Sequence, residues 1–334
     1  MKKNTKKILS GATGAAMLLS GVATVASAEV GFEVKADETV KEYNKVANVQ
    51  GGFSFDQETV TPADEVFNLF GTVVTGMCAK PDFAVGEEKT EYFVNVGGKI
   101  EKSYTVDLKE KTEESRVQLC ACATGAATAN AQITGVLLKD VLELAKTTEE
   151  VNTVAVTGAD GYTTKLPLTY VLEKEAMIAY QVGGKDIPTG AQFWVPETVA
   201  KYFTRNVVDI ELLKEENVPE VEARDEALQA EVVINNAVEG ASFAAGQAIT
   251  FEGYADDLGE PIAKVEFSLD GGETWTAYET TGASADKWVY WHFSTEIEEA
   301  GEYQLTARAV TESGKVSPLA ANVAFEVVDG AAMA

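Results

Sequence analysis

The stretch "KVEFSLDGGETW" (residues 264–275) decides how the C-terminal part of this chain is expected to fold. Val265, Phe267 and Leu269 alternate with polar residues and therefore share one face of a strand, and "DGG" then turns the chain before Trp275. The segments "AITFEGYA", "KWVYWHFS", "GEYQLTARAV" and "AANVAFEVV" show similar alternation, at roughly the spacing of a β-sandwich. The sequence therefore predicts an all-β sandwich over residues 228–328, followed by a tail at 329–334.

The pattern upstream of this sandwich is mixed. "RVQLCA", "VNTVAVTG", "YTTKLPL" and "VVDIELL" are typical of strands, and "EYFVNVGGKIEKSYTVDL" (91–108) predicts two strands around a Gly-Gly turn. "GVLLKDVLELAK", in contrast, has apolar residues at helical spacing and predicts an amphipathic helix. The mixture favours an α+β domain over residues 65–215 rather than a regular βαβ alternation.

Two further segments have no apolar period. Residues 29–64 are polar and rich in turn residues, which predicts an extended lead-in to the first domain. The charged stretch "KEENVPEVEARDEA" contains a proline, and it predicts an interdomain linker at residues 216–227. We therefore expect two domains joined by a short polar connection.

The first 28 residues have the features of a secretory signal peptide. Four lysines precede an apolar run of small residues, and Ala-Ser-Ala at 26–28 is a typical cleavage site. No second stretch reaches about 18 consecutive apolar residues, which argues against membrane insertion. We expect a soluble protein, exported to the cell envelope or beyond after cleavage near Ala28.

The chain is strongly acidic, with a formal net charge of −26. Removal of residues 1–28, which carry four lysines and no acidic residue, makes the remainder more negative by four charges. A charge of this sign and size argues against nucleic acid and anionic membrane surfaces as partners.

The three cysteines, Cys78, Cys120 and Cys122, cannot all pair within the chain. Cys120 and Cys122 are poor partners for each other, because a bridge between residues two apart strains disulfide geometry. Either of them could pair with Cys78 in an oxidising compartment. The thiol left over is expected to be buried or to ligate a metal.

His292 is the chain's only histidine, and it lies between aromatic residues on a predicted sandwich strand. A Ser-His-Asp triad or a zinc cluster would have to include this histidine. Its position between aromatic residues on a strand favours a structural role instead. Haem-attachment, phosphate-loop, calcium-loop and G-x-G-x-x-G motifs are also missing from the sequence.

Five segments, in order, resemble the sulfite oxidase family of molybdopterin oxidoreductases, over about residues 65–328. They are "ANAQITGVLLKDVLELA", "GADGYTTKLPL", "VAKYFTRNVVDIEL", "VEFSLDGGETW" and "GEYQLTARAVTESGKVSP". The resemblance implies an α+β molybdopterin-binding domain followed by an immunoglobulin-like dimerisation domain, and hence a homodimer. It also implies a molybdenum–molybdopterin cofactor, a small-molecule oxo substrate and, because no haem motif is present, a separate electron carrier.

The resemblance also implies roles for five residues. The family binds molybdenum through one protein thiolate, and a soft thiolate at the end of a strand suits that metal. By its order in the sequence, this ligand would be Cys120 or Cys122. "VQLC" favours Cys120 and "CATG" favours Cys122. Tyr162 matches an active-site tyrosine whose hydroxyl can donate a hydrogen bond to an oxo group or substrate oxygen. Lys201 matches a lysine that approaches the cofactor, and Arg205 lies close to it in sequence.

Three departures from the family pattern leave a second function open. "ATGAAT" follows the cysteines where the family has arginines, Gln192 stands where it has an arginine, and "GMCAKPDF" replaces its Asn/His-containing loop. Arginines bind the terminal phosphate of the pterin through paired N–H groups. The two functions are an exported oxidoreductase that transfers an oxygen atom and two electrons, and a cofactor-free scaffold of the same fold with structural cysteines.

Overall fold

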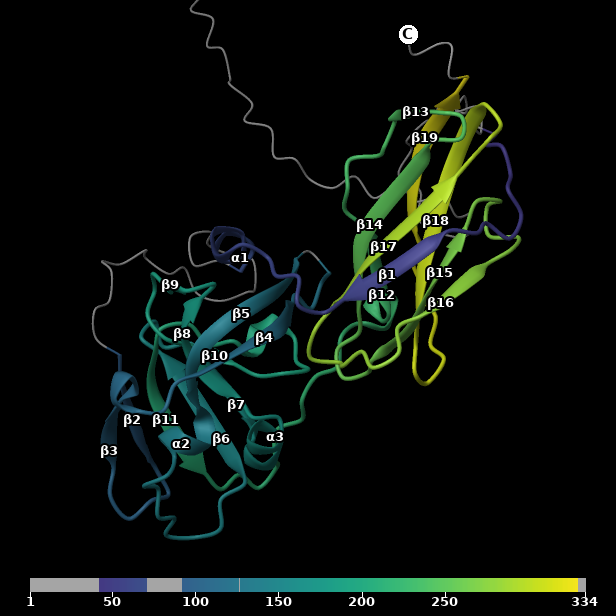
Figure 1. Ribbon diagram of the computed structural model, residues 1–334. Coiled ribbons are helices and arrows are strands. Elements are labelled where there is room, and N and C mark those ends of the chain that lie inside the picture. The colour runs from purple at the N-terminus through teal and green to yellow at the C-terminus, as the bar shows by residue number, and fades with distance from the viewer. Residues whose placement is uncertain (1–41, 71–91, 126, 330–334) are drawn as a thin grey trace, which may run out of the picture. The chain divides into compact units, whose positions relative to one another are not determined.

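The computed structural model describes residues 42–70, 92–125 and 127–329 (Figure 1). The predicted signal peptide, Cys78 and the predicted tail from residue 330 onwards lie outside these ranges.

The first domain is built mainly from two β-sheets. One sheet contains, in spatial order, β3 (Tyr104–Asp107), β2 (Phe93–Gly98), β11 (Val207–Leu213), β6 (Thr153–Gly158) and β7 (Thr163–Pro167). The other contains β10 (Gln192–Trp194), β8 (Met177–Val182), β5 (Thr128–Leu137) and β4 (Glu114–Ala121), with β9 (Lys185–Asp186) paired to β8. The predicted strands in this part of the sequence are confirmed.

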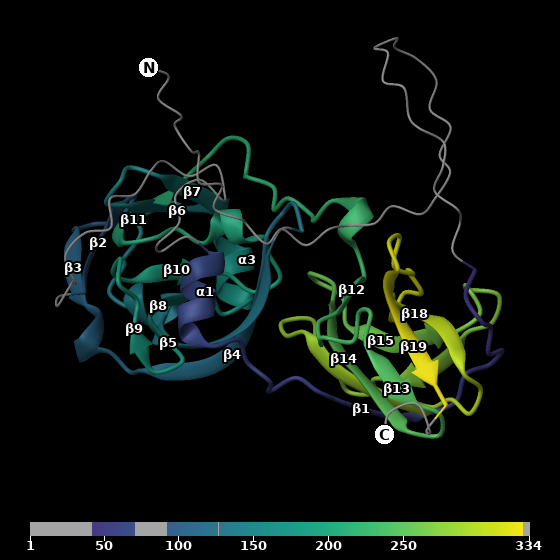
Figure 2. The same ribbon diagram turned by 90° about the horizontal axis from the view of Figure 1, so that it is seen from above.

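Short helices connect these strands. They are α1 (Ala63–Leu69), α2 (Leu138–Val141) and α3 (Leu168–Glu173), with single 3₁₀ turns η1 (Leu108–Glu110), η2 (Ala200–Tyr202) and η3 (Glu226–Leu228). Helix α1 lies against β5 (Figure 2). Apolar residues of both sheets form one continuous core, in which Phe193, Trp194 and Phe203 are among the most deeply buried side chains. The described part of this domain is therefore mostly β-structure with little helix.

The expected amphipathic helix within "GVLLKDVLELAK" is wrong for most of its length. Strand β5 continues to Leu137, and α2 covers only the next four residues. Strand β5 lies between β4 and β8 in its sheet, and residues of both its faces are buried, all but one of them. A strand buried on both faces has a continuous apolar run, which periodicity alone cannot distinguish from a buried helix.

The second domain is a sandwich of two sheets, as predicted from the alternating pattern. The first sheet contains β1 (Gly52–Asp56), β17 (Val289–Glu296), β14 (Ala248–Asp256) and β12 (Glu231–Ile234). The second contains β13 (Ser242–Ala244), β19 (Ala321–Val328), β18 (Gly301–Thr311), β15 (Ile262–Ser268) and β16 (Thr276–Glu279). The inner faces meet in an apolar core where the Phe267 ring stacks on Phe293 with a centroid distance of 4.2 Å.

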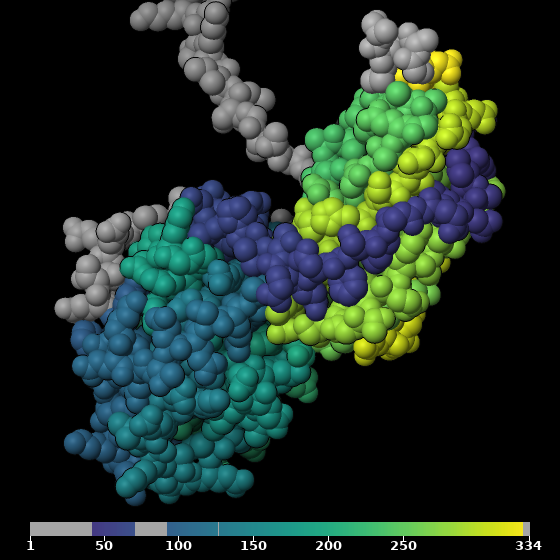
Figure 3. Space-filling model, in the orientation of Figure 1, coloured from purple at the N-terminus to yellow at the C-terminus, as the bar shows by residue number. Residues whose placement is uncertain are grey.

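An N-terminal segment completes the first sandwich sheet. Strand β1 pairs antiparallel with β17, more than 230 residues later in the sequence, and forms an edge of that sheet. Figure 3 shows this purple segment lying against the yellow-green sandwich strands. The Phe53 ring stacks on Tyr278 at 5.0 Å, and the Tyr278 hydroxyl is hydrogen-bonded to the backbone of Gly51. Part of the predicted lead-in is therefore an edge strand of the sandwich.

Candidate functional site

The two cysteines of the predicted metal site lie at the end of β4: Cys120 is in the strand, and Cys122 follows its last residue. Alternate residues of a strand point to opposite faces. Cys120 and Cys122 accordingly pack into the core of the first domain, whereas Leu119 and Ala121 pack with Trp288 of the sandwich. Only 1% of Cys120 and 4% of Cys122 is exposed. Both side chains are therefore buried on the same side of the strand.

A tight turn follows the strand and fixes Cys122. The backbone N–H of Cys122 donates to the carbonyl of Ala127 at 2.8 Å, and its carbonyl accepts from the N–H of Gly125 at 3.2 Å. The Cys122 Sγ lies 3.2 Å from the hydroxyl oxygen of Thr124. Cys120, by comparison, lies inside β4 and pairs in register with Ala129 of β5. The two sulfur atoms thus differ in backbone setting: one is in a strand, the other in a turn.

A second segment of the predicted site runs beside this strand end. Ala121 forms a parallel β-bridge with Val199, directly before the 3₁₀ turn η2 that contains Lys201. The Tyr162 hydroxyl donates a hydrogen bond of 2.9 Å to the backbone carbonyl of Lys201. These contacts bring three predicted elements together: β4 with the following Cys122 (the cysteine strand), Tyr162, and residues 199–202 (the Lys201 segment).

Tyr162 is held by the turn between β6 and β7. Its N–H donates to Asp160 Oδ1 at 3.0 Å, and its carbonyl accepts from the N–H of Gly158 at 2.9 Å. The half-buried hydroxyl directs its proton to the Lys201 carbonyl. A role as donor to a substrate oxygen would require that proton to change partner.

Lys201 and Arg205 have different environments. The Lys201 side chain is 29% exposed and forms an ion pair with Glu222 of the linker. Arg205 is only 5% exposed. Its carbonyl oxygen would lie 2.4 Å from a Cβ placed on Gly158, so glycine at that position allows the β6–β7 turn to approach the Arg205 backbone. Lys201 thus reaches the surface, whereas Arg205 belongs to the interior.

The other arginines after residue 28 have side-chain partners outside the five predicted site residues. Arg116 donates from Nε and Nη2 to Gln118 Oε1, and Arg308 donates from Nε to Glu266. Arg224 pairs with Asp256 and Glu231. Lys201 and Arg205 are the two cations that the sequence predicts for the candidate site.

The sequence gives no signal for the cluster around Arg224, which belongs to the predicted interdomain linker at residues 216–227. The Arg224 side chain is 1% exposed, that of Asp256 is fully buried and that of Glu231 is 14% exposed. Burial, together with the neighbouring Asp256, raises the pKa of Glu231 to about 7. Burial also raises the pKa of Asp257 to about 6. A run of charged residues gives no sign of which member is buried.

His292 lies on β17 as expected, with its Nε2 atom 3.4 Å from a carboxylate oxygen of Glu252. Its ring meets that of Tyr290 edge-on at 5.3 Å. Within the described ranges, no three His, Cys, Asp or Glu side chains are grouped to hold a metal ion.

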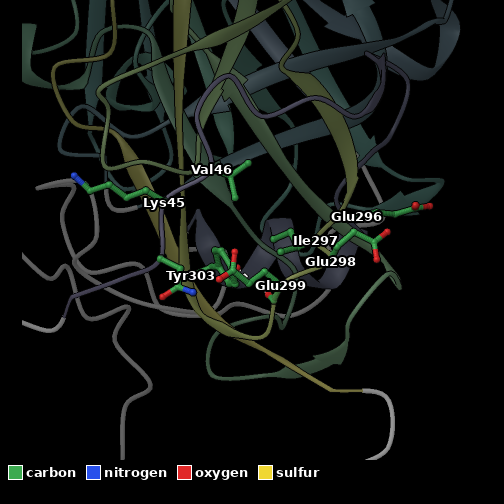
Figure 4. Close-up of a pocket in the computed structure, with 8 residues that line it drawn as sticks. Lys45, Val46, Glu296, Ile297, Glu298, Glu299 and Tyr303 are labelled. Atoms are coloured by element: carbon green, nitrogen blue, oxygen red, sulfur yellow. Dashed lines mark hydrogen bonds between the residues drawn. The ribbon is translucent and has the colours of Figure 1, made fainter.

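A cavity of about 480 Å³ lies in the sandwich (Figure 4). It is lined by Asn44, Lys45, Val46, residues 296–299 and Tyr303. None of the five predicted site residues lines it, and Figure 4 shows the Lys45 and Glu296 side chains extending away from each other. The candidate site is therefore defined by the contacts of the cysteine strand and not by this cavity.

Comparisons with known proteins agree with the two-domain organisation. Residues 82–219 match the family model described as "Oxidoreductase molybdopterin binding domain", and residues 231–307 match "Bacterial Ig domain". A sulfite oxidase of Gallus gallus is 32% identical over 85 residues, which cover 24% of this chain and 18% of that protein.

A solved structure gives the same result at the level of fold. The sulfane dehydrogenase SoxCD of Paracoccus pantotrophus aligns with a TM-score of 0.53 and 17% identity, covering 86% of each chain. The chain thus combines a region similar to molybdopterin-binding oxidoreductase domains with a region similar to bacterial immunoglobulin-like domains, and it is similar to sulfite oxidase over part of its length. Across the described residues, no helix is long and apolar enough to cross a membrane.

Proposed function

We propose that this chain is an exported molybdopterin-dependent oxidoreductase, which moves an oxygen atom and two electrons between a small oxo substrate and a metal–pterin centre. The main support is the meeting of the cysteine strand with the Lys201 segment, through the Ala121–Val199 bridge and the Tyr162–Lys201 hydrogen bond. These contacts lie within the range that matches the molybdopterin-binding family. Electrons would pass to a separate carrier.

The chemistry of the side chains fits this cofactor. One thiolate, from Cys120 or Cys122, would be the protein ligand of the metal, and soft thiolates suit such a metal. When bound, the cofactor supplies the oxo-transfer and redox chemistry that protein side chains lack. Lys201 and Arg205 would provide positive charge for the cofactor phosphate or an anionic substrate. The Tyr162 hydroxyl would orient a substrate oxygen.

The structure of the turn bears on which sulfur is the ligand. Cys122 follows the strand, in a turn where its backbone is hydrogen-bonded to Gly125 and Ala127. Cys120 lies within the paired strand, and its own β-ladder partner is Ala129. Both alternatives stay open, and separate substitutions distinguish them.

The test is the molybdenum content of Cys120→Ser and Cys122→Ser, each isolated from the natural host. One variant is expected to lose the metal and the other to retain it, because the family centre uses one protein sulfur. The unfolding midpoint of each variant controls for damage to the fold. Equal metal content in both variants and the unsubstituted chain would contradict the assignment of a cysteine ligand.

A second candidate function is a cofactor-free scaffold that binds a ligand or partner. The observations that favour it are the deep burial of both cysteines and the ion pair that engages Lys201. On this alternative the cysteines are structural, and neither serine variant changes a metal content that is already negligible.

We also propose that the first domain is an α+β fold extending over residues 65–215, and that the chain self-associates through the sandwich at 228–328. Light scattering on the full chain tests the self-association, and the mass of a dimer is expected. A monomer at micromolar concentration would contradict it.

A further inference from the structure

Part of the linker is held against the Lys201 segment of the candidate site. Val221 packs against the core of the first domain, and the backbone N–H of Glu222 donates to the Tyr202 hydroxyl at 3.0 Å. Two residues later, the buried Arg224 side chain binds Asp256. The backbone on both sides of Glu222 is therefore fixed by contacts that do not involve its carboxylate.

The Glu222 carboxylate itself is only loosely committed. It pairs with Lys201 Nζ, but the Glu222 side chain is 68% exposed and that of Lys201 is 29% exposed. Exposed ion pairs of this kind change an equilibrium by at most about five-fold, and salt weakens them further. Breaking this ion pair therefore costs little free energy, whereas displacing the surrounding backbone would break the contacts of Val221, Tyr202 and Arg224.

Glu222 occupies the position that an anionic ligand of Lys201 would need. A lysine ammonium binds carboxylates and tetrahedral oxyanions through the same N–H groups. Because Arg205 is buried, Lys201 is the surface-reaching cation of this segment. A carboxylate already bound to it must leave, or share the ammonium, when an oxyanion arrives.

We propose that Glu222 is a built-in competitor for Lys201, a linker carboxylate that an oxyanion ligand displaces on binding. The oxyanion is either the phosphate of the cofactor or an anionic substrate, and the proposal rests on the proposed function only in identifying Lys201 as their contact. Displacement releases the side chain but keeps the linker backbone on Tyr202 and Arg224. Glu222 thus sets the affinity and salt dependence of anion binding without itself touching the reacting atoms.

The test is calorimetric titration of the full chain, free of molybdenum, with inorganic phosphate at low ionic strength. Glu222→Gln is expected to bind phosphate about three- to five-fold more tightly than the unsubstituted chain, because the competing charge is gone. Glu220→Gln is the matched control: it removes the same charge from an exposed residue of the same linker. This control is expected to bind phosphate as the unsubstituted chain does.

The double variant Glu222→Gln with Lys201→Gln is expected to lose the gain in phosphate affinity that Glu222→Gln shows alone. Equal affinities of Glu222→Gln and Glu220→Gln, a gain that survives in the double variant, or no measurable phosphate binding to Glu222→Gln would each overturn the proposal. Absence of molybdenum from the native protein would overturn the proposed function and leave this result unaffected. Repeating the titration on molybdenum-loaded chain separates the two ligands: a lost gain identifies the cofactor phosphate, and a retained gain identifies the substrate.

Discussion

Replacement of Arg224 by leucine is expected to destabilise the native chain strongly. The guanidinium is 1% exposed and bonds both to Asp256, at 2.5 Å, and to Glu231. Leucine keeps part of the apolar volume but leaves two carboxyl groups without their cation. Removing one partner of a buried ion pair costs about 3–5 kcal/mol, because the remaining charge stays buried without compensation.

The loss is expected to depend on pH. Burial raises the pKa of Glu231 to about 7, well above the ordinary value near 4.5. A carboxyl group with a raised native pKa contributes stability at low pH, which is lost as the pH rises from about 4.5 through about 7. Without Arg224 the pKa values of Glu231 and Asp256 rise further, since the guanidinium lowers both. The deficit of Arg224→Leu should therefore be larger at pH 8 than at pH 5.

Urea unfolding at pH 5 and pH 8 measures both effects. Tryptophan fluorescence follows the sandwich well, because Trp275, Trp288 and Trp291 all belong to it. Arg308→Leu is the matched control: its guanidinium also pairs with a buried glutamate but is 30% exposed, so a smaller loss is expected. A loss below about 1 kcal/mol for Arg224→Leu at both pH values, or a larger loss at pH 5, would refute the reasoning.

Two further substitutions test the packing of the sandwich. Phe267→Ala removes a fully buried ring stacked on Phe293 and should lower the free energy of unfolding by about 3–5 kcal/mol in urea titration; a loss under about 1 kcal/mol would contradict this packing. Gly253→Ala would bring a Cβ to 1.8 Å from the Val233 carbonyl oxygen, whereas Gly52→Ala meets nothing within 4 Å. We therefore expect a clear drop in the thermal midpoint for Gly253→Ala and almost none for Gly52→Ala, and equal midpoints would argue against the close strand approach.

The strands of the sandwich were predictable because alternation reports one buried face directly. Val265, Phe267 and Leu269 are all buried on β15 and directly after it, as their spacing predicts. The same holds for β7, which follows the turn that contains Tyr162 and has alternating exposed and buried residues. Local pattern was sufficient wherever a strand has one face in the core and one in solvent.

Features that depend on distant parts of the chain were not predictable. "GFSFD" has the alternation of a strand, but nothing in it indicates pairing with β17 far along the sequence. Strand β5 was mistaken for a helix near its end, because burial on both faces removes the alternation that identifies a strand.

The candidate site was predictable only in part. The resemblance identified Tyr162 and Lys201, which do lie in contact, but it gave no sign of their hydrogen bond or of the ion pair with Glu222. The positions of Glu222 and Arg224 depend on tertiary contacts of a segment that has no apolar period. Both residues have the sequence pattern of an exposed linker, and only the fold shows that Arg224 is buried while Glu222 is exposed.

The ratio of molybdenum atoms to chains in the protein isolated from its natural host tests the proposed function most directly. A ratio close to one, accompanied by pterin, is the expected result. A preparation that is correctly folded but contains only traces of molybdenum would contradict it and leave the cofactor-free scaffold as the function.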